Sequence, residues 1–370
     1  MSNDLSQQKK ILLGHLNSNG DCLYATAVAR QIKHDYPGCH LTWAIGSACR
    51  PILDGNPHVD EVWEVPLGRI SEETVVAAWQ QFEHEAGERR KKGDFDEVFL
   101  TQYSYGRLQN YAGTTRSSVF RGYPGPITVP IAPIVRLSLK EIENVRHFAM
   151  VHRLVDRSEV ILFECSPKSN QSFVTPDFAL AVTQQLIAAF PAVSVILSSN
   201  VSFQSADERI IDGSVLSFRE NVELTKHCSL LIGCSSGISW LSTAESAKLL
   251  PMIQLIKDDF WTSMVNDHRH WGLATNKIIE MTTCPVDTVY RCVEAIFKRG
   301  FDTARLLFHE QIPLPATAYE VLFRDLLRQN QYRRGFIFGF NSRLRLKFAF
   351  QWIKSAIRNS VAKAVANARY

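Results

Sequence analysis

The stretch KILLGHLNSNGD, residues 10–21, decides the expected fold. Its first part is a short apolar run, which predicts a buried strand over residues 10–16. The following residues, 17–21, are polar and predict a turn, and residues 22–35 carry a helical pattern that ends before a Pro-Gly pair. A short apolar strand followed directly by a helix is the repeating unit of a parallel sheet covered by helices.

The same alternation continues on both sides of a proline-rich segment. Residues 123–136 contain four prolines and no period, which predicts an irregular crossing, and a helix is expected over about 138–155. Before the crossing we expect strands at His40–Ile45, Glu61–Val65 and Glu97–Thr101 and a helix at about 71–92. After it we expect strands at Val160–Phe163, Val193–Ser198, Leu230–Gly233 and Met252–Ile256 and helices at 176–190 and 236–247.

This pattern predicts an α/β protein in which two Rossmann-like domains face each other across a cleft. The expected boundaries are residues 1–135 for the N-terminal domain, 136–158 for a linker helix and 159–300 for the C-terminal domain. Residues 301–370 are expected to form C-terminal helices with a basic aromatic tail. In such sheets ligands bind beyond the carboxyl ends of the strands, so the cleft is the expected site.

The composition restricts the class of protein. Of 370 residues, 45% are hydrophobic and 21% are charged, which excludes disordered, collagen-like and coiled-coil chains. No stretch approaches the roughly 20 apolar residues of a membrane span, and no secretory signal opens the chain, so we expect a cytoplasmic protein. The eight cysteines form no CxxC pair and no zinc-type spacing, so neither a structural disulfide nor a bound metal is expected.

The charge is unevenly distributed along the chain. Nine of the 41 basic residues lie in residues 331–370, which contain no Asp or Glu, so the other 330 residues carry 32 basic and 37 acidic groups. From residue 346 onward apolar side chains recur every three or four positions, flanked by cations. We expect this tail to lie on an anionic membrane surface through Arg345, Lys347, Trp352, Lys354 and Arg358. Packing back across the two domains and binding of RNA remain alternatives.

Asp21 is the candidate catalytic residue. It follows the turn Ser18, Asn19 and Gly20 at the carboxyl end of the first strand, where its carboxylate would face the cleft. A carboxylate in that position can remove a proton from a bound hydroxyl group. The alternative is that Asp21 only caps the following helix. The turn contains no GxGxxG, so it is not a nicotinamide dinucleotide fingerprint.

The turn after the strand Leu230–Gly233 is the candidate anion site. Ser235, Ser236, Gly237 and Ser239 lie where a helix begins, and N–H and O–H donors at a helix N-terminus favour a phosphate group. The alternative is an ordinary serine cap. No Walker lysine follows, so ATP hydrolysis is not supported.

Three further polar residues follow strands of the second domain. Lys168 and Gln171 lie in the loop after the strand Val160–Phe163, and Ser198 ends the next strand. A lysine in such a loop can neutralise a phosphate as a point charge, although an exposed, solvated Lys168 is an equally good interpretation.

Residues Lys10–Pro66 resemble the start of glycosyltransferase family 9, which includes the ADP-heptose lipopolysaccharide heptosyltransferases. The resemblance rests on Ser18-Asn19-Gly20-Asp21, on the helix segment Ala25–Arg30, on the strand Leu41–Ile45 and on the segment from Gly55 to Val62 (GNPHVDEV). These motifs come in the family's order over about 55 residues, and residues 160–256 match more loosely.

The resemblance implies the GT-B fold, with the acceptor on the N-terminal domain and a nucleotide sugar on the C-terminal one. It also implies that Asp21 is the general base of an inverting transfer and that Ser235-Ser236-Gly237 lies at the family's diphosphate loop. The family needs no metal, so no cofactor or metal is expected. The chain departs from the family at Ser235 and Trp240, which replace an Asp and a His, and at Gln171, near the family's lysine.

Together these features predict a GT-B glycosyltransferase, peripheral on the cytoplasmic face of the inner membrane, that binds no nucleic acid. It would move a hexosyl or heptosyl group from a nucleotide sugar to a saccharide hydroxyl of a lipid-linked glycan of the lipopolysaccharide core or O-antigen type. The alternatives are a non-catalytic GT-B scaffold or binding subunit with a degenerate donor site, and an epimerase acting on a free nucleotide sugar.

Overall fold

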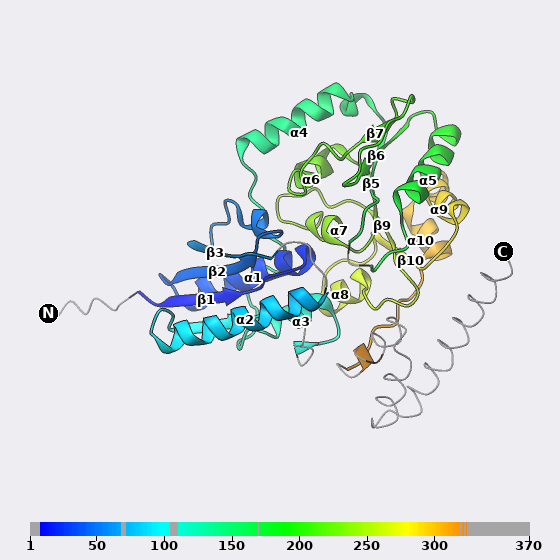
Figure 1. The fold of residues 1–370 in the computed structure, drawn as a ribbon. Helices are drawn as coiled ribbons and strands as arrows, with labels where there is room; N and C mark the ends of the chain where they lie inside the picture. The colour runs from blue at the N-terminus through cyan, green and yellow to red at the C-terminus, as the bar shows by residue number, and fades with distance from the viewer. Residues whose placement is uncertain are drawn as a thin grey trace, which may run out of the picture.

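The strands form two separate parallel sheets (Figure 1). The structure, a computed structural model, describes residues 8–67, 72–103, 110–168, 170–317, 320–321 and 323. The first sheet has the order β3-β2-β1-β4 and consists of β1 (Lys10–Gly14), β2 (His40–Gly46), β3 (Glu61–Val65) and β4 (Glu97–Leu100). The second has the order β10-β9-β8-β5-β6-β7 and consists of β5 (Glu159–Glu164), β6 (Val193–Ser198), β7 (Ile210–Asp212), β8 (Leu230–Gly233), β9 (Met252–Leu255) and β10 (Ile278–Met281).

Both sheets have a Rossmann-like strand order. From its far edge the second sheet runs β7-β6-β5-β8-β9-β10, so the chain starts in the middle, moves to one edge and then crosses to the other side. The first sheet repeats the opening of this order, with β4 beside β1 on the side away from β2 and β3. The points where the direction reverses, between β1 and β4 and between β5 and β8, are where such folds bind ligands.

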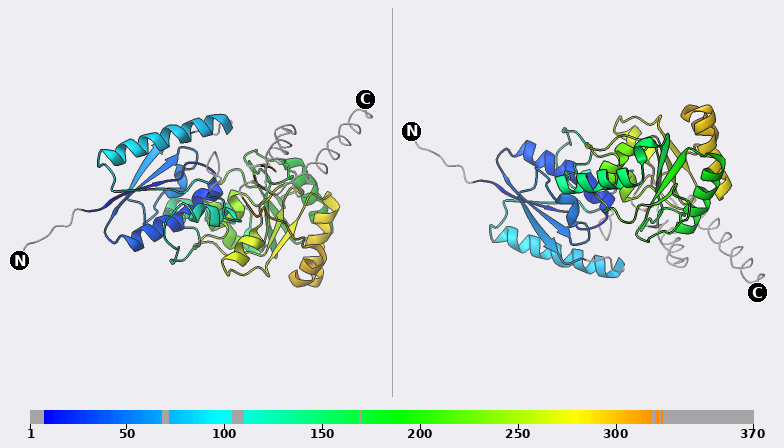
Figure 2. Two further views of the ribbon diagram at one scale, coloured as in Figure 1. Left: turned by 90° about the horizontal axis from the view of Figure 1, so that it is seen from below. Right: turned by 90° about the horizontal axis from the view of Figure 1, so that it is seen from above.

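Alternating side chains explain why helices cover both faces of the first sheet. Ile11 and Leu13 of β1 pack in one cluster with α1 (Asn19–Asp35), whereas Leu12 packs in another with α2 (Glu72–Lys91). Successive strand residues point to opposite faces, so a wholly apolar strand requires a cover on each side. Figure 2 shows α1 and α2 on opposite sides of this sheet.

The second sheet is covered in the same way. One face packs in a cluster with α5 (Pro176–Ala189), α9 (Val286–Arg299) and α10 (Phe301–Phe308). The other face belongs to the cluster that also contains α1 and the inner face of the first sheet, so one hydrophobic core extends through both halves. The helices joined by this core include α3 (Thr115–Phe120), α4 (Leu139–Val151), α6 (Asn221–Leu224), α7 (Gly237–Leu241) and α8 (Met264–His270).

The expected α/β class and the strands anticipated from the sequence are confirmed, with end points shifted by one or two residues. The expected helix over 236–247 is wrong in its length, because α7 ends at Leu241 and turns follow. The short strand β7 and the edge strand β10 were not anticipated. The domain boundaries stay predictions, and the tail residues Arg345, Lys347, Trp352, Lys354 and Arg358 lie outside the described residues.

Within the part of the chain that the structure describes, no helix is both long enough and apolar enough to span a bilayer.

Candidate functional site

The two turns singled out from the sequence meet between the sheets. The β1–α1 turn and the β8–α7 turn both follow central strands, and α1 packs directly against α7. A Cβ atom built on Gly237 would lie 3.2 Å from Cβ of Asn19, and one built on Gly20 would lie 3.2 Å from Cδ1 of Trp240. The structure therefore brings Asn19, Gly20, Gly237 and Trp240 together at one place, where the ligand-binding ends of both sheets converge.

Asp21 lies in the first turn of α1, and the N-cap of that helix is Ser18. The alternative that Asp21 only caps the helix is therefore wrong. Its side chain is buried, with 7% of the residue exposed, and it accepts no hydrogen bond from the described residues. Burial alone raises the pKa of the Asp21 carboxyl to about 8. A carboxyl group with a pKa near neutrality and without a competing partner has the properties of a general base.

The backbone at both turns adopts conformations that L-residues rarely take. Ser18 has φ 74° and Ser235 has φ 49°, and Asn170 in the loop after β5 has φ 56°. Non-glycine residues with positive φ cost of order 1–3 kcal/mol each and concentrate where chains bind ligands. The β1–α1 turn, the β8–α7 turn and the loop after β5, which the sequence analysis selected, thus each contain a residue with positive φ.

A buried glutamate, which the sequence analysis did not select, organises the β8–α7 turn. Glu164 ends β5, and only 3% of the residue is exposed. Its Oε2 accepts hydrogen bonds from the backbone N–H of Cys234 at 3.0 Å and from Ser239 Oγ at 2.8 Å. Its Oε1 accepts from the backbone N–H of Ile238 at 3.3 Å and from the hydroxyl of Ser236. The donors expected to face a phosphate are directed to this internal carboxylate.

Two glutamines complete this buried polar network. The side-chain oxygen of Gln254, on β9, accepts hydrogen bonds from the backbone N–H of Ser235 at 2.7 Å and from Ser239 Oγ at 3.0 Å. Gln171 donates from Nε2 to the carbonyl oxygen of Ser235 at 3.3 Å, while its own Oε1 is buried without a partner. Gln171 therefore bonds to the β8–α7 turn from the loop after β5, and its predicted role in donor binding stays a prediction.

The other two residues predicted to bind the nucleotide-sugar donor, Lys168 and Ser198, have different surroundings. Lys168 is exposed on the loop after β5. Ser198 is buried at the end of β6, where its hydroxyl donates to Oδ1 of Asn221 at 3.1 Å. Their role in donor binding stays a prediction. A lysine that the sequence analysis did not select, Lys257, bonds through Nζ to the side chain of Asn170 and so fixes the same loop.

A small cavity of about 10 Å³ lies beside the contact between α1 and α7. Tyr24, Thr114, Trp240, Trp261 and Asp267 are among the residues that line it, so both halves of the molecule contribute. The Tyr24 ring packs edge-on against Trp240 with 5.0 Å between ring centroids, and its hydroxyl is buried without a partner. The phenol pKa of Tyr24 is raised, mainly by burial.

A buried ion pair next to this cavity connects the two halves. Arg116 of α3 places Nε 3.0 Å from Oδ2 of Asp267 on α8, and both side chains are almost wholly buried. Thr114 donates from its hydroxyl to Oδ1 of Asp267 at 3.0 Å. Burial raises the pKa of Asp267 although the Arg116 charge opposes the rise. Neither residue belongs to a sequence motif, and only the folded chain brings them together.

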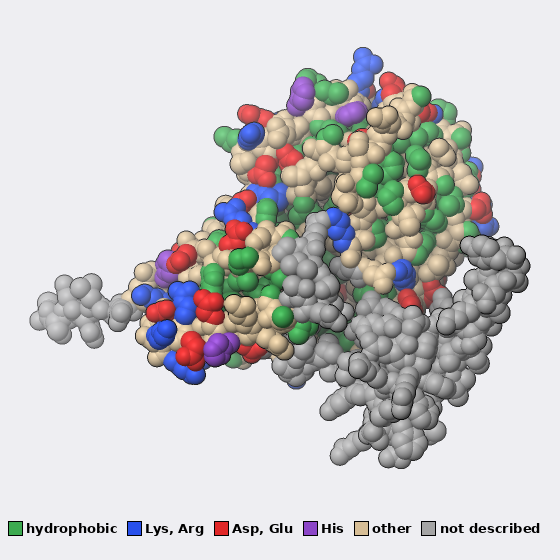
Figure 3. All heavy atoms as spheres, in the orientation of Figure 1, with side chains coloured by type: hydrophobic (Ala, Val, Ile, Leu, Met, Phe, Trp, Pro, Cys, Tyr) green, Lys and Arg blue, Asp and Glu red, His purple; other side chains and the backbone are tan. Residues whose placement is uncertain are grey.

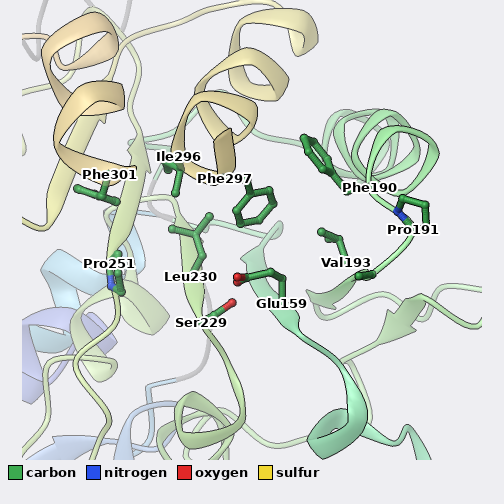
Figure 4. A pocket seen from close by; sticks show the side chains of 11 residues that line it. Glu159, Phe190, Pro191, Val193, Ser229, Leu230, Pro251, Ile296, Phe297 and Phe301 are labelled. Carbon is green, nitrogen blue, oxygen red and sulfur yellow. The ribbon is translucent and has the colours of Figure 1, made fainter. Parts of the chain in front are cut away.

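An open groove of about 360 Å³ lies at the opposite edge of the second sheet. It is lined by residues at the amino ends of strands, such as Glu159, Val193 and Leu230, and by the aromatic rings of Phe190 and Phe297 (Figure 4). Ligands of Rossmann-like sheets bind at the carboxyl ends. The groove is therefore not part of the candidate site.

The described part of the chain contains no cluster of charged residues suited to a metal ion. No group of three or more His, Cys, Asp or Glu side chains among those residues has the geometry to hold a metal ion. On the face drawn in Figure 3, Lys and Arg side chains are interspersed with Asp and Glu.

The strand orders, the layered helices and the meeting of two ligand-binding edges define a protein with two Rossmann-like halves. The chain is similar to the crystal structure of a glycosyl transferase of family 9 from Veillonella parvula DSM 2008, with 14% identity, a TM-score of 0.52, and 81% of this chain and 95% of that one covered. At this identity the likeness establishes a shared fold, and the chain has the fold expected of a family 9 relative.

Other solved structures align over similar lengths. They include ADP-heptose lipopolysaccharide heptosyltransferase II of E. coli, with 15% identity, a TM-score of 0.47, and 88% of this chain and all of that one covered. A UDP-N-acetylglucosamine 2-epimerase is 10% identical with a TM-score of 0.45, and 88% of this chain and 97% of that one are covered. No family model matches the sequence, and no curated protein does.

Proposed function

We propose that the chain is a glycosyltransferase in which Asp21 is the general base. The observation that carries this proposal is the Asp21 carboxyl itself, buried in the first turn of α1 with a pKa raised to about 8. It lies beside the helix contact where the ligand-binding edges of both sheets meet. The fold that the chain shares with a family 9 glycosyl transferase supports the same assignment.

The proposed reaction is a single inverting displacement. The acceptor hydroxyl oxygen forms a bond to the anomeric carbon of the donor sugar while its proton passes to a carboxylate oxygen of Asp21. The bond between that carbon and the donor phosphate breaks, and the nucleotide diphosphate leaves with the electron pair. Burial suits Asp21 to this task, because a carboxylate with a raised pKa is a stronger base than a solvated one.

We assign the nucleotide-sugar donor to the second half and the saccharide acceptor to the first, as in the family that the sequence resembles. The transferred group would be a hexosyl or heptosyl unit, and the acceptor a lipid-linked glycan of the lipopolysaccharide type. We propose that neutralisation of the leaving diphosphate uses backbone and side-chain donors of the second half and no metal. The basic tail, residues 331–370, would hold the protein at the cytoplasmic face of an anionic membrane.

The first test is a thermal-shift screen of the purified full chain against ADP-, UDP-, GDP- and CMP-linked sugars without added metal. A ligand that binds only the folded chain raises Tm by mass action, so a selective rise identifies the nucleotide. Transfer to a lipid-linked saccharide is then compared for wild type and Asp21→Asn. We expect the variant to lose transfer by about 100-fold or more while its affinity for the donor is unchanged.

Asp35→Asn is the matched control for this test. Asp35 is the last residue of the same helix, where it accepts hydrogen bonds from Tyr123 and Gln31 away from the turn. Its variant should transfer sugar at the wild-type rate. Normal turnover by Asp21→Asn would refute the role of Asp21.

A second candidate function is a non-catalytic scaffold or binding subunit. The specific observation that favours it is Glu164, which occupies the donors of the β8–α7 turn. No shift in Tm with any nucleotide sugar would support this candidate over the glycosyltransferase.

A further inference from the structure

Glu164 occupies the position in the second sheet at which an anionic ligand is expected. It is the last residue of β5, and the turn that it contacts follows β8, so it lies where the strand order reverses. Four donors from that turn converge on its carboxylate, two from backbone N–H groups and two from serine hydroxyls. Backbone and hydroxyl donors at a helix start are what such folds offer to a phosphate group.

We propose that Glu164 is a specificity-determining residue that excludes phosphate groups from the β8–α7 turn. Its two carboxyl oxygens take the place that the oxygens of a ligand phosphate would occupy. The diphosphate of a donor is therefore bound elsewhere on the second half, outside this turn.

The hydrogen bonds already made within the β8–α7 turn support the proposed exclusion of phosphate. A serine hydroxyl has a single proton to donate. The proton of Ser236 is directed to Glu164, and that of Ser239 lies between two acceptors of the network, Oε2 of Glu164 at 2.8 Å and Oε1 of Gln254 at 3.0 Å. The backbone N–H of Ser235, which lies between the two N–H groups bonded to Glu164, donates to Gln254 instead. A phosphate entering the turn would have to displace these bonds.

Charge supports the exclusion as well. Placing a second anion beside a buried carboxylate brings two like charges together, and such a juxtaposition strongly weakens binding. Gln171, which bonds to Ser235, is neutral and cannot offset the added charge. Among the described side chains that bond within this network, none is cationic.

The inference rests on the proposed function in one respect, because it takes the excluded phosphate to be part of the nucleotide-sugar donor. Its test requires no sugar transfer. We would measure the Kd of inorganic pyrophosphate by calorimetry for the full-length wild type, Glu164→Ala and Glu164→Gln. Removing the carboxylate leaves four donors facing an empty space in the first variant, and the second removes the charge while conserving shape. We expect pyrophosphate to bind both variants at least about tenfold more tightly than wild type.

Two controls locate any gain at the turn. Glu280→Gln changes a second buried glutamate, whose Oε2 accepts a hydrogen bond from Ser263 at 2.8 Å and whose Oε1 accepts from the N–H of Val265 at 3.1 Å. It should leave the Kd of pyrophosphate unchanged. Adding Ser239→Ala to Glu164→Ala should reverse part of the gain, because it removes one of the freed donors.

The outcomes are distinct. A gain in both Glu164 variants that Ser239→Ala reduces supports the inference, whether or not the chain transfers sugar. Equal affinities of wild type, Glu164→Ala and Glu164→Gln would overturn it, as would an equal gain in Glu280→Gln. If Glu164→Ala does not fold, the comparison of wild type with Glu164→Gln decides.

Discussion

Two buried carboxyl groups, one on each side of the meeting turns, differ in their surroundings and so in their chemistry. Asp21 accepts no hydrogen bond from the described residues, and burial raises its pKa to about 8. Glu164 accepts four hydrogen bonds from the β8–α7 turn. The surroundings thus leave the Asp21 carboxyl free of hydrogen-bond donors and hold the Glu164 carboxyl group in place.

The raised pKa of Asp21 predicts a pH dependence of sugar transfer. A general base must be ionised to accept a proton, so the rate should increase as pH rises through about 8 and level off above it. Initial rates between pH 6 and pH 9 at saturating donor test this expectation. Asp35→Asn should show the same profile, and a rate independent of pH over this range would contradict it.

The same burial predicts that Asp21 destabilises the fold at alkaline pH. A carboxyl whose pKa is higher in the folded chain contributes stability below its unfolded pKa, and that contribution is lost as pH rises through about 8. Asp21→Asn, which cannot ionise, should therefore be more stable than wild type at pH 9 by at least about 1 kcal/mol. Urea denaturation at pH 5 and pH 9 measures the difference, which should be larger at pH 9.

The sequence was sufficient to place Asp21 and the glycine-containing turn, because a short apolar strand followed by a polar turn and a helix has few alternative structures. It was not sufficient to find Glu164. An acidic residue at the end of an apolar strand belongs to no motif, and its partners lie about 70 residues later in the chain. Arg116 and Asp267 were missed for the same reason, because only tertiary structure pairs them.

At the scale of elements, two short helices of the second half begin in the same way. The start of α7 is bonded by Glu164 from β5, and the start of α8 is bonded by Glu280 from β10. A carboxylate at a helix N-terminus satisfies N–H groups that have no partner within the helix and is favoured by the helix dipole. A neighbouring strand thus supplies a carboxyl acceptor at each helix start, in α8 together with the local cap Ser263, which accepts from the N–H of Asn266. Local sequence patterns do not reveal these acceptors from other strands.

The cap on α8 predicts a second pH effect on stability. Burial raises the pKa of Glu280 to about 7, although its hydrogen bonds oppose the rise. Its contribution to stability is therefore present at acidic pH and is lost as pH rises through about 7. The free energy of unfolding of wild type minus that of Glu280→Gln should fall between pH 5 and pH 8, and a constant difference would contradict the assignment.

Strand elements were easier to predict than helices in this chain. Buried parallel strands are continuous apolar runs bounded by polar turns, and their end points agree within one or two residues. The helix expected to extend to residue 247 ends at Leu241, because Ser242 and Thr243 direct their hydroxyls to backbone carbonyls of the preceding turn and α7 gives way to turns. Side-chain bonds to the backbone of this kind compete with helix continuation.

At the scale of the molecule, Arg219 ties the two halves together. It lies between β7 and α6 in the second half, yet its guanidinium donates to the carbonyl oxygens of Pro51 at 2.7 Å and Asp54 at 3.0 Å in the first. It also pairs with Glu141 of α4, and mainly for that reason the pKa of Glu141 is lowered to about 2. One buried side chain therefore joins both halves and the helix that links them.

Replacing Arg219 should destabilise the whole molecule. Arg219→Met leaves several buried carbonyl groups and a carboxylate without their donor, which should lower the free energy of unfolding by about 3–5 kcal/mol. Arg209→Met is the control, because Arg209 bonds to Asp207 and Ile187 within the second half only. Urea denaturation should show a much smaller loss for the control, and equal losses would contradict a special role for Arg219.

The close contact between the two halves has a consequence for the speed of any reaction between them. The space between Asn19 and Gly237 would not accept a methyl group without displacing Phe218. The adjoining cavity has a volume of about 10 Å³, far below the roughly 300 Å³ of a small ligand pocket. On the proposed function, these packed turns must separate before a nucleotide sugar can reach Asp21, and again before the product leaves. If that separation is the slowest step, added glycerol should lower the maximal rate of transfer as solvent viscosity rises.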